Sequence, residues 1–480
     1  MNVLFVTIDQ LRGDSTGFAG HPLVRTPHLD SLAARGVHLA RHFSQAAPCS
    51  PGRASLYTGM YQMNHRVVAN GTPLPSGLDN VALLARRAGY VPTLFGYTDM
   101  GLDPKDAEGP ADPRLDFYDG LLPGIEAGCW LPDEPTAWVE HLKSLGVDTT
   151  GGAKALLATE DARSEELSLA AFLTDQFLGW HAAQAPGWFA HLSYLRPHPP
   201  YVAAGRWAEA YDPKDVALPI GAAPEEHRHP LHSAALKFEM AQAPSKESEL
   251  RAMRAQYYGA ISAVDEQVGR VLEVLAAAGQ IADTLIIVTA DHGEQLGDHG
   301  LKEKLGFFPE SYHVPCLWVD PHHEEWAGKR VEQFTENVDV LPSLAAALGE
   351  VIPRQCDGRV LQHLFGDPVI EWRSAAHYEW DWRDLFIEAA AVPWPLDESL
   401  SRMNLAVSVT EDFGFVRFGD GSRLCFDLRT DPTWRTTTED PDVLIAAMEA
   451  QLDWRQVHLR RELTDLLLRP GHPGQWPANT

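Results

Sequence analysis

Short apolar runs recur along most of the chain and alternate with stretches in which apolar residues repeat at helical spacing. The run 3–8 ends at Asp9, and the run 284–289 leads to Asp291. Nearly continuous apolar runs of this length are typical of central parallel strands, because such strands are buried on both faces. We therefore expect strands at 3–8, 90–97, 188–194, 284–289 and 314–319.

Helical spacing marks several segments between these runs. The stretch 250–272 places apolar residues three or four positions apart, as in an amphipathic helix, and is expected to end near Gly279. A second helix is predicted from Pro27, with Thr26 at its N-cap and Gly36 at its end. Further helices are expected after residue 49, before residue 89, and at 164–184 and 338–348.

This alternation predicts an α/β fold with a large, mostly parallel sheet flanked by helices. Beyond about residue 365 the pattern changes to short strands at 405–410, 413–418 and 423–427, with a hairpin turn at 419–421. We expect a small C-terminal antiparallel β plus helix subdomain there. The predicted division is a catalytic domain at 1–365 and an α+β subdomain at 366–480.

Two segments, 99–163 and 202–248, lack clear periodicity. The first is rich in Gly, Pro, Asp and Trp, and long insertions of this kind more often form a lid or pocket wall than scaffold. We expect both segments to contribute to recognition of the leaving group of a ligand at the carboxyl edge of the sheet, where ligands of parallel sheets gather.

Charge and cysteine content narrow the function. The formal net charge of -27 over 480 residues disfavours binding to nucleic acid or an anionic membrane, so an anionic substrate would require a local positive pocket. The five cysteines form no Cys-x-x-Cys pair, which indicates neither a disulfide framework nor a structural zinc site. With no apolar run of about 18 residues and no signal-peptide pattern, we expect a cytoplasmic protein without a membrane span.

Two strand exits supply a candidate metal site. Asp9-Gln10 and Asp291-His292 could offer two carboxylates, an amide oxygen and an imidazole to one divalent cation. Taken singly, each pair is more often a turn or a helix cap. Their joint occurrence at strand ends favours a metal, and the imidazole shifts the preference from calcium toward manganese, zinc or iron. We expect Mn²⁺, with Zn²⁺, Fe²⁺ and Ca²⁺ as alternatives.

Cys49 lies next to a predicted short helix. Ser50 is the expected N-cap and Pro51 the first helical residue, with Gly59 at the end and Arg53 in the first turn. A helix N-terminus beside an arginine is suited to anions. The alternative is a structural cysteine buried beside a packing helix.

The segment Cys49-Ser-Pro-Gly-Arg53 fits the Cys-x-Pro-x-Arg signature of type I sulfatases in the alkaline phosphatase superfamily. Thr26-Pro-His-Leu-Asp30 and Asp291-His-Gly also resemble segments of that family. Four segments are similar to its phosphonate monoester hydrolase branch, which also hydrolyses phosphodiesters: Met63-Asn-His-Arg66, Arg196-Pro-His-Pro-Pro200, Asp291-His-Gly-Glu-Gln-Leu-Gly-Asp-His299 and His377-Tyr-Glu-Trp-Asp-Trp-Arg-Asp384.

The resemblance implies that a formylglycine-generating enzyme oxidises Cys49 to formylglycine, whose hydrated aldehyde is the nucleophile. One hydroxyl, activated by the metal, would displace the alcohol from phosphorus or sulfur, and deprotonation of the other would expel the product anion. The implied metal ligands are Asp9, Gln10, Cys49, Asp291 and His292. Arg53 would orient the nucleophile. Four further residues would face the non-bridging oxygens or the leaving group: Asn70, Tyr97, His198 and Lys304.

Each residue of that last group has a structural alternative. Asn70 could form a turn, Tyr97 could belong to the core, His198 could brace the proline turn, and Lys304 could be solvated. Asp99 departs from the branch, which carries a hydroxyl residue after Tyr97-Thr98. A carboxylate beside an anionic substrate is unfavourable unless it turns away or meets a cationic leaving group, so we expect Asp99 on the leaving-group side.

The resemblance therefore implies a hydrolase of phosphonate monoesters and phosphodiesters, small anionic esters, with lesser activity on sulfate esters. The alternative is an arylsulfatase or another sulfuric ester hydrolase, although Gln10 and His292 differ from the Asp and Asn of many calcium-dependent arylsulfatases. A thiol-nucleophile phosphatase is disfavoured because the spacing between Cys49 and Arg53 is too short for its loop. A catalytically inactive binding protein is a further alternative, and the family also suggests a homo-oligomer.

Overall fold

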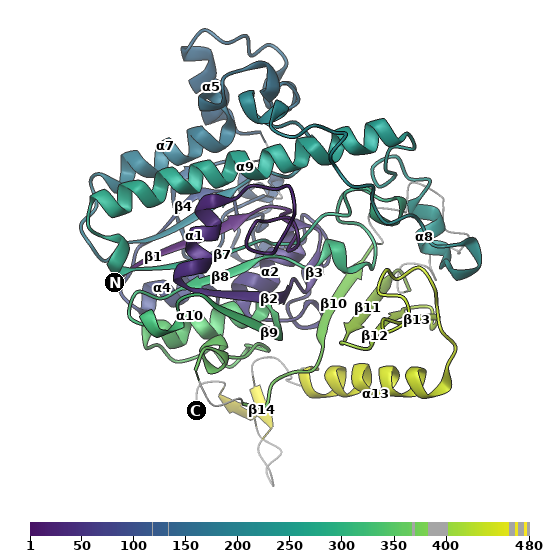
Figure 1. The fold of residues 1–480 in the computed structure, drawn as a ribbon. Coiled ribbons are helices and arrows are strands. Elements are labelled where there is room, and N and C mark those ends of the chain that lie inside the picture. The colour runs from purple at the N-terminus through teal and green to yellow at the C-terminus, as the bar shows by residue number, and fades with distance from the viewer. Residues whose placement is uncertain are drawn as a thin grey trace.

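The computed structural model describes residues 1–117, 119–132, 134–366, 370–382, 402–459, 466–468 and 475–477. The fold is built around an eight-stranded sheet of order β5-β4-β6-β1-β7-β8-β2-β9 with helices on both faces (Figure 1). Its strands are β1 (Asn2–Ile8), β2 (Val37–Phe43), β4 (Pro92–Gly96), β5 (Glu126–Trp130), β6 (Phe189–Tyr194), β7 (Thr284–Thr289), β8 (Cys316–Val319) and β9 (Lys329–Glu336).

The central strands are apolar in sequence because they are buried in the middle of the sheet. β1 runs parallel to β6 and β7, and all residues of β1 and β7 are buried. β8 is antiparallel to both of its neighbours, β7 and β2, whereas β2 is parallel to β9. The predicted α/β class with a mostly parallel sheet is therefore confirmed.

Alternating side chains of β1 enter two different hydrophobic cores. Leu4, Val6 and Ile8 belong to one core, and Val3 and Phe5 belong to the other, as expected for a strand covered on both faces. The first core includes residues of α1 (Pro27–Arg35), α7 (Leu169–His181) and α9 (Glu247–Ala277), and the second includes residues of α2 (Cys49–Thr58), α4 (Val81–Arg87) and α10 (Val340–Leu348).

A second sheet has the order β13-β12-β11-β10-β3. It consists of β3 (Ala46–Ala47), β10 (Ala376–Asp381), β11 (Asn404–Val409), β12 (Phe413–Phe418) and β13 (Arg423–Asp427), and α13 (Pro441–His458) packs against it (Figure 1). The expected antiparallel hairpin at 419–421 is present between β12 and β13. β3, which is separated from Cys49 in α2 only by Pro48, pairs in parallel with β10. The division at residue 365 stays a prediction.

Shorter elements complete the described part of the chain: α3 (Gln62–His65), α5 (Thr136–Ser144), α6 (Gly152–Leu157), α8 (Pro230–Ala235), β14 (Leu466–Leu468) and β15 (Gln475–Pro477). Arg383 and Asp384 of the last motif lie outside the described residues. Over the ranges that the structure covers, no helix combines the length and apolar character needed to cross a bilayer.

Sequence analysis missed three strands of the large sheet. β5 lies inside the 99–163 insertion, so the expectation that this segment is not scaffold is wrong for these residues. The first three residues of β5 are exposed, and β9, at the other edge of the sheet, has three exposed residues in its first five positions. Edge strands lack the continuous apolar run of a central strand, which explains why β5 and β9 were overlooked. β2 carries His and Arg within the strand, which breaks its apolar run.

Candidate active site

Cys49 is the first residue of α2, with Pro48 at the N-cap. The prediction that Ser50 caps this helix and Pro51 begins it is therefore wrong, and Arg53 lies beyond the first turn. The backbone N–H of Ser50 donates to Asn70 Oδ1 at 3.0 Å, so a side chain from outside the helix supplies the acceptor that an N-cap residue would provide. Gly59 ends the helix with φ of 68°, as predicted.

Four predicted metal ligands converge at the N-terminus of α2. The candidate ligand atoms of Asp9, Cys49, Asp291 and His292 all lie within 4.8 Å of one another, and all four residues are buried. His292 Nε2 is 3.3 Å from Cys49 Sγ, 3.9 Å from Asp9 Oδ1 and 4.0 Å from Asp291 Oδ1. The two distant strand exits therefore form one cluster.

The hydrogen bonds of this cluster fit a divalent metal ion. His292 Nδ1 is 3.0 Å from the Gly293 carbonyl oxygen. Because that oxygen can only accept, Nδ1 carries the proton and Nε2 presents its lone pair to the cluster, the arrangement typical of a metal-binding histidine. Asp9 Oδ1 is buried and has no hydrogen-bond partner among the described residues. A buried carboxylate oxygen in that state is costly unless a cation contacts it.

Gln10 lies beside the cluster. Its backbone N–H donates to Asp291 Oδ1 at 3.2 Å. The side-chain nitrogen donates to Glu294 and, at 3.3 Å, to Glu303, while Oε1 accepts from Lys304 Nζ at 2.9 Å. The two glutamates thus fix which end of the amide is the acceptor. Sequence reasoning missed both of them, although Glu294 lies only two residues beyond His292.

Arg53 connects the two carboxylates of the cluster. Its guanidinium donates to Asp291 Oδ2 at 2.8 Å and to Asp9 Oδ2 at 3.3 Å, and also to Ser193 Oγ at 2.9 Å and the Tyr97 carbonyl at 2.7 Å. Arg53 is fully buried. It therefore contacts the two carboxylates of the candidate metal cluster, and its expected role in orienting the nucleophile stays a prediction. Ser193 carried no signal in the sequence.

A cavity of about 590 Å³ opens over Cys49. Its polar lining includes most of the predicted site residues: Asp9, Cys49, Asn70, Tyr97, Asp99, His198 and Lys304. Its apolar lining comes largely from the insertion and the proline turn: Leu131, Pro132, Pro135, Leu157, Ala158, Leu169, Leu195, Pro199 and Pro200. The expectation that the insertion supplies a pocket wall is therefore confirmed beyond β5.

Polar contacts within the cavity also constrain Tyr97, His198 and Lys304. The Tyr97 hydroxyl donates to Asp9. His198 Nδ1 is 2.8 Å from the Pro199 carbonyl oxygen, so Nδ1 donates and Nε2 accepts from Lys304 Nζ at 2.9 Å. Burial, reinforced by the neighbouring Lys304, lowers the pKa of His198 to about 3. His198 is therefore neutral and Lys304 carries the positive charge.

The unmodified thiol of Cys49 is poorly suited to act as a nucleophile. Burial raises the pKa of this thiol well above its ordinary value, and Asp9 and Asp291 raise it further, against the opposing effect of Lys304. Catalytic cysteines instead have depressed pKa values that populate the thiolate. The structure thus adds to the case against a thiol-nucleophile phosphatase.

Arg196 holds the turn that carries His198. It is buried and donates to the carbonyl oxygens of His198 at 2.8 Å, Pro200 at 2.7 Å and Leu157 at 2.8 Å. Its Nε also donates to Glu160 Oε2 at 2.7 Å. This network ties the proline turn to the cavity wall.

Replacing Arg196 by alanine is expected to lower kcat/KM by about 100-fold, because small displacements of a positioned group have effects of that size. Thermal unfolding should also begin at a lower temperature, since Glu160 loses a buried partner. Steady-state kinetics and thermal denaturation of Arg196→Ala test this. Arg206→Ala, at an exposed ion pair with Glu266, is the control and should change neither quantity appreciably. An Arg196→Ala enzyme with wild-type kcat/KM would contradict the positioning role.

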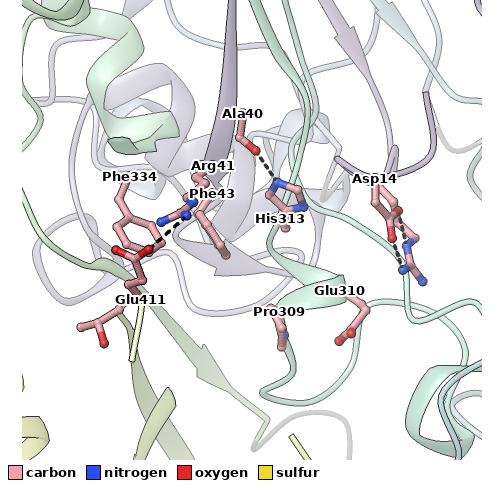
Figure 2. Close-up of a pocket in the computed structure, with 11 residues that line it drawn as sticks. Asp14, Ala40, Arg41, Phe43, Pro309, Glu310, His313, Phe334 and Glu411 are labelled. Carbon is pink, nitrogen blue, oxygen red and sulfur yellow. Dashed lines mark hydrogen bonds and ion pairs between the residues drawn. The ribbon is translucent and has the colours of Figure 1, made fainter. Parts of the chain in front are cut away.

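A second cavity, of about 340 Å³, lies between Asp14 and Arg41 (Figure 2), and Arg12 also lines it. Its charges are paired within the protein: Arg12 with Asp14 at 2.6 Å and Arg41 with Glu411 at 3.8 Å. Its His313 Nε2 donates to the Ala40 carbonyl at 3.0 Å. Across the described residues, the cluster at Cys49 is the one group of three or more His, Cys, Asp or Glu side chains placed to hold a metal. The cavity over Cys49 is therefore the candidate active site.

Comparisons with known proteins identify the family of the chain. The Sulfatase family matches residues 1–350. The multifunctional alkaline phosphatase superfamily protein PehA of Trinickia caryophylli is 35% identical over 504 residues, covering 96% of both chains. The choline-sulfatase of Rhizobium meliloti (strain 1021) is 30% identical over 363 residues, covering 72% of this chain and 67% of the relative.

Two solved structures extend the match to the whole fold. The phosphonate monoester hydrolase of Agrobacterium radiobacter has a TM-score of 0.87 and 38% identity and covers 98% of both chains. That of Silicibacter pomeroyi has a TM-score of 0.87 and 33% identity and covers 99% of both chains. As the segment from Cys49 to Arg53 predicted, the chain belongs to the sulfatase family of the alkaline phosphatase superfamily.

Proposed function

We propose that this ester hydrolase acts on phosphonate monoesters and phosphodiesters, with lesser activity on sulfate esters, and depends on a metal ion and on formylglycine at residue 49. The observation that carries the proposal is the buried cluster of Asp9, Cys49, Asp291 and His292 below a cavity that presents Lys304. The relative named PehA and two solved phosphonate monoester hydrolases, which match nearly the whole chain, support it.

The residues of the site have complementary tasks in this proposal. Asp9, Gln10, Asp291 and His292 would hold a divalent metal ion, which supplies Lewis-acid activation when bound. Formylglycine at residue 49 would supply a hydroxyl nucleophile whose ester breaks down without attack by external water. Arg53 donates hydrogen bonds to both Asp9 and Asp291, and its rigid guanidinium fixes the orientation of the two carboxylates.

On the cavity side, the chain itself supplies positive charge for the ester anion. Lys304 carries that charge, and its contacts with Gln10 Oε1 and His198 Nε2, both at 2.9 Å, fix its position. A preorganised cation at this place stabilises negative charge that develops on the non-bridging oxygens. Because His198 is neutral, it adds no second positive charge beside Lys304. It can accept a proton only at Nε2.

A sulfatase is the second candidate, favoured by the similarity to a choline-sulfatase. The two functions would differ in kcat/KM on matched aryl phosphonate, phosphodiester, phosphate monoester and sulfate ester substrates, measured with one enzyme preparation. We expect the phosphonate monoester and the phosphodiester to exceed the sulfate by at least about 10-fold, a modest difference in transition-state binding. A sulfate ester that leads by orders of magnitude would establish the sulfatase instead.

We further propose Mn²⁺ as the metal, a formylglycine-generating enzyme as the maturation partner, and a cytoplasmic location. The nitrogen ligand His292 supports manganese over calcium. All five cysteines are free in the structure, which suits a reducing compartment. Metal analysis of the purified protein and cell fractionation would test the first and third of these proposals.

A further inference from the structure

Asp99 is a buried carboxyl group that lines the active-site cavity and has no partner among the described residues. It follows β4, is 7% exposed and lines the cavity together with Cys49 and Asn70. Among the described residues, none donates a hydrogen bond to its carboxyl group or forms an ion pair with it. Buried polar side chains normally have partners, so the position of Asp99 requires an explanation.

The other charged groups in the cavity do not supply this partner. Lys304 is engaged by Gln10 and His198. Lys154 and Glu134 line the cavity but are exposed to solvent. Arg53, whose charge acts on Asp99, forms its ion pairs with Asp9 and Asp291. Within the described part of the site, Asp99 thus lines the cavity without an ion pair to a protein cation.

Electrostatics make this arrangement unfavourable for a substrate that is only anionic. Burial raises the pKa of Asp99 to about 7, Asp9 and Asp291 add to the shift, and Arg53 opposes it. A bound ester brings another negative charge into the same cavity. A substrate that also carries an ammonium group would turn this repulsion into attraction, because a desolvated carboxylate forms strong charge-assisted hydrogen bonds with an ammonium group.

We propose that Asp99 determines specificity by binding an ammonium group on the organic part of the substrate, so that the preferred substrates are zwitterionic esters. The proposal rests on the proposed function only for the identity of the ester that is cleaved. The apolar wall formed by Leu131, Leu157 and Leu195 would contact the methylene groups that join the ammonium to the ester. Asp99 accepts the hydrogen bond, and no covalent step involves it.

The test uses substrate pairs that differ in one positive charge. In the first pair, para-nitrophenyl aminoethylphosphonate is compared with para-nitrophenyl propylphosphonate, which places the ammonium on the retained substituent. In the second, aminoethyl phenylphosphonate is compared with propyl phenylphosphonate, which places it on the leaving alcohol. The ratio of kcat/KM within each pair is measured for the wild type, Asp99→Asn, Asp99→Ser and Glu134→Gln.

For the wild type we expect the ammonium member to be preferred by about 10-fold or more in at least one pair, and that pair identifies the side on which Asp99 acts. Asp99→Asn and Asp99→Ser should lower the preference by about 10- to 100-fold, as expected for loss of a charged hydrogen bond. Glu134→Gln, which removes an exposed carboxylate from the same cavity, should leave the ratio unchanged. A wild type without preference, or a loss that is equal for both members, would overturn the proposal.

Binding and sulfate controls separate this inference from the proposed function. Calorimetry with aminoethylphosphonic and propylphosphonic acids reports the ammonium preference without turnover, and aminoethyl and propyl sulfate report it for a sulfatase. If the phosphonate esters are not hydrolysed but an Asp99-dependent ammonium preference appears in either control, the proposed function fails and the role of Asp99 holds. If the phosphonate esters are hydrolysed and no assay shows the preference, the role of Asp99 fails alone.

Discussion

Replacing Cys49 by alanine is expected to lower kcat/KM by about 10⁴-fold or more for every ester that the enzyme hydrolyses, because the variant can form no covalent bond to phosphorus or sulfur. Steady-state kinetics on the best phosphonate monoester measures the loss. Cys425→Ala is a matched control, since Cys425 is also buried but lies in β13 and does not line the cavity. This control should retain wild-type kcat/KM.

Cys49→Ser sharpens this prediction. Serine places a hydroxyl at the same position but lacks the second hydroxyl of the hydrated aldehyde. An ester formed on serine therefore cannot expel the product anion by deprotonation of that second hydroxyl. We therefore expect at most a burst of one equivalent of alcohol, followed by arrest, with the phosphonyl group retained on the peptide that contains residue 49. Repeated turnover by Cys49→Ser at the wild-type rate would contradict the formylglycine requirement. So would an active wild-type enzyme in which mass spectrometry finds only the Cys49 thiol.

The candidate metal cluster could be predicted from sequence because strand register places Asp9 and Asp291 together. β1 and β7 are neighbours in the sheet, and Thr7 pairs with Thr289. Asp9 and Asp291 each lie two residues beyond these paired positions, so parallel strands bring them to the same edge. Continuous apolar runs marked both strands, and the polar residues at their ends marked the site. The local sequence pattern and the pairing of β1 with β7 therefore point to the same site.

The contacts that orient the cluster depend on tertiary structure and were not predictable in the same way. Asn70 replaces the expected Ser50 cap, and Ser193, on a different strand, supports Arg53. Glu303 reaches Gln10 although the two residues are 293 positions apart in the sequence. None of these residues has a distinctive local pattern. Their roles follow from the way the fold brings loops and the end of β6 together at the carboxyl edge.

Arg53 links stability to catalysis in this arrangement, since its guanidinium pairs with both Asp9 and Asp291 and all three side chains are buried. Arg53→Ala would leave two neighbouring carboxylates without this cation. Removing one partner from a buried ion pair typically costs about 3–5 kcal/mol, so we expect a much lower unfolding temperature for the metal-free variant. We also expect kcat/KM to fall by about 10³-fold, because the carboxylates lose the donors that fix them.

Metal addition distinguishes this role from simple destabilisation. In Arg53→Ala a bound divalent ion would be the main remaining positive charge on Asp9 and Asp291, so Mn²⁺ should raise the unfolding temperature of the variant by more than it raises that of the wild type. Arg12→Ala is the matched control: Arg12 is also buried, but it pairs with Asp298 outside the cluster. It should lower the unfolding temperature without changing the increment produced by Mn²⁺. Equal increments for wild type, Arg12→Ala and Arg53→Ala would show that Arg53 does not share the two carboxylates with a metal.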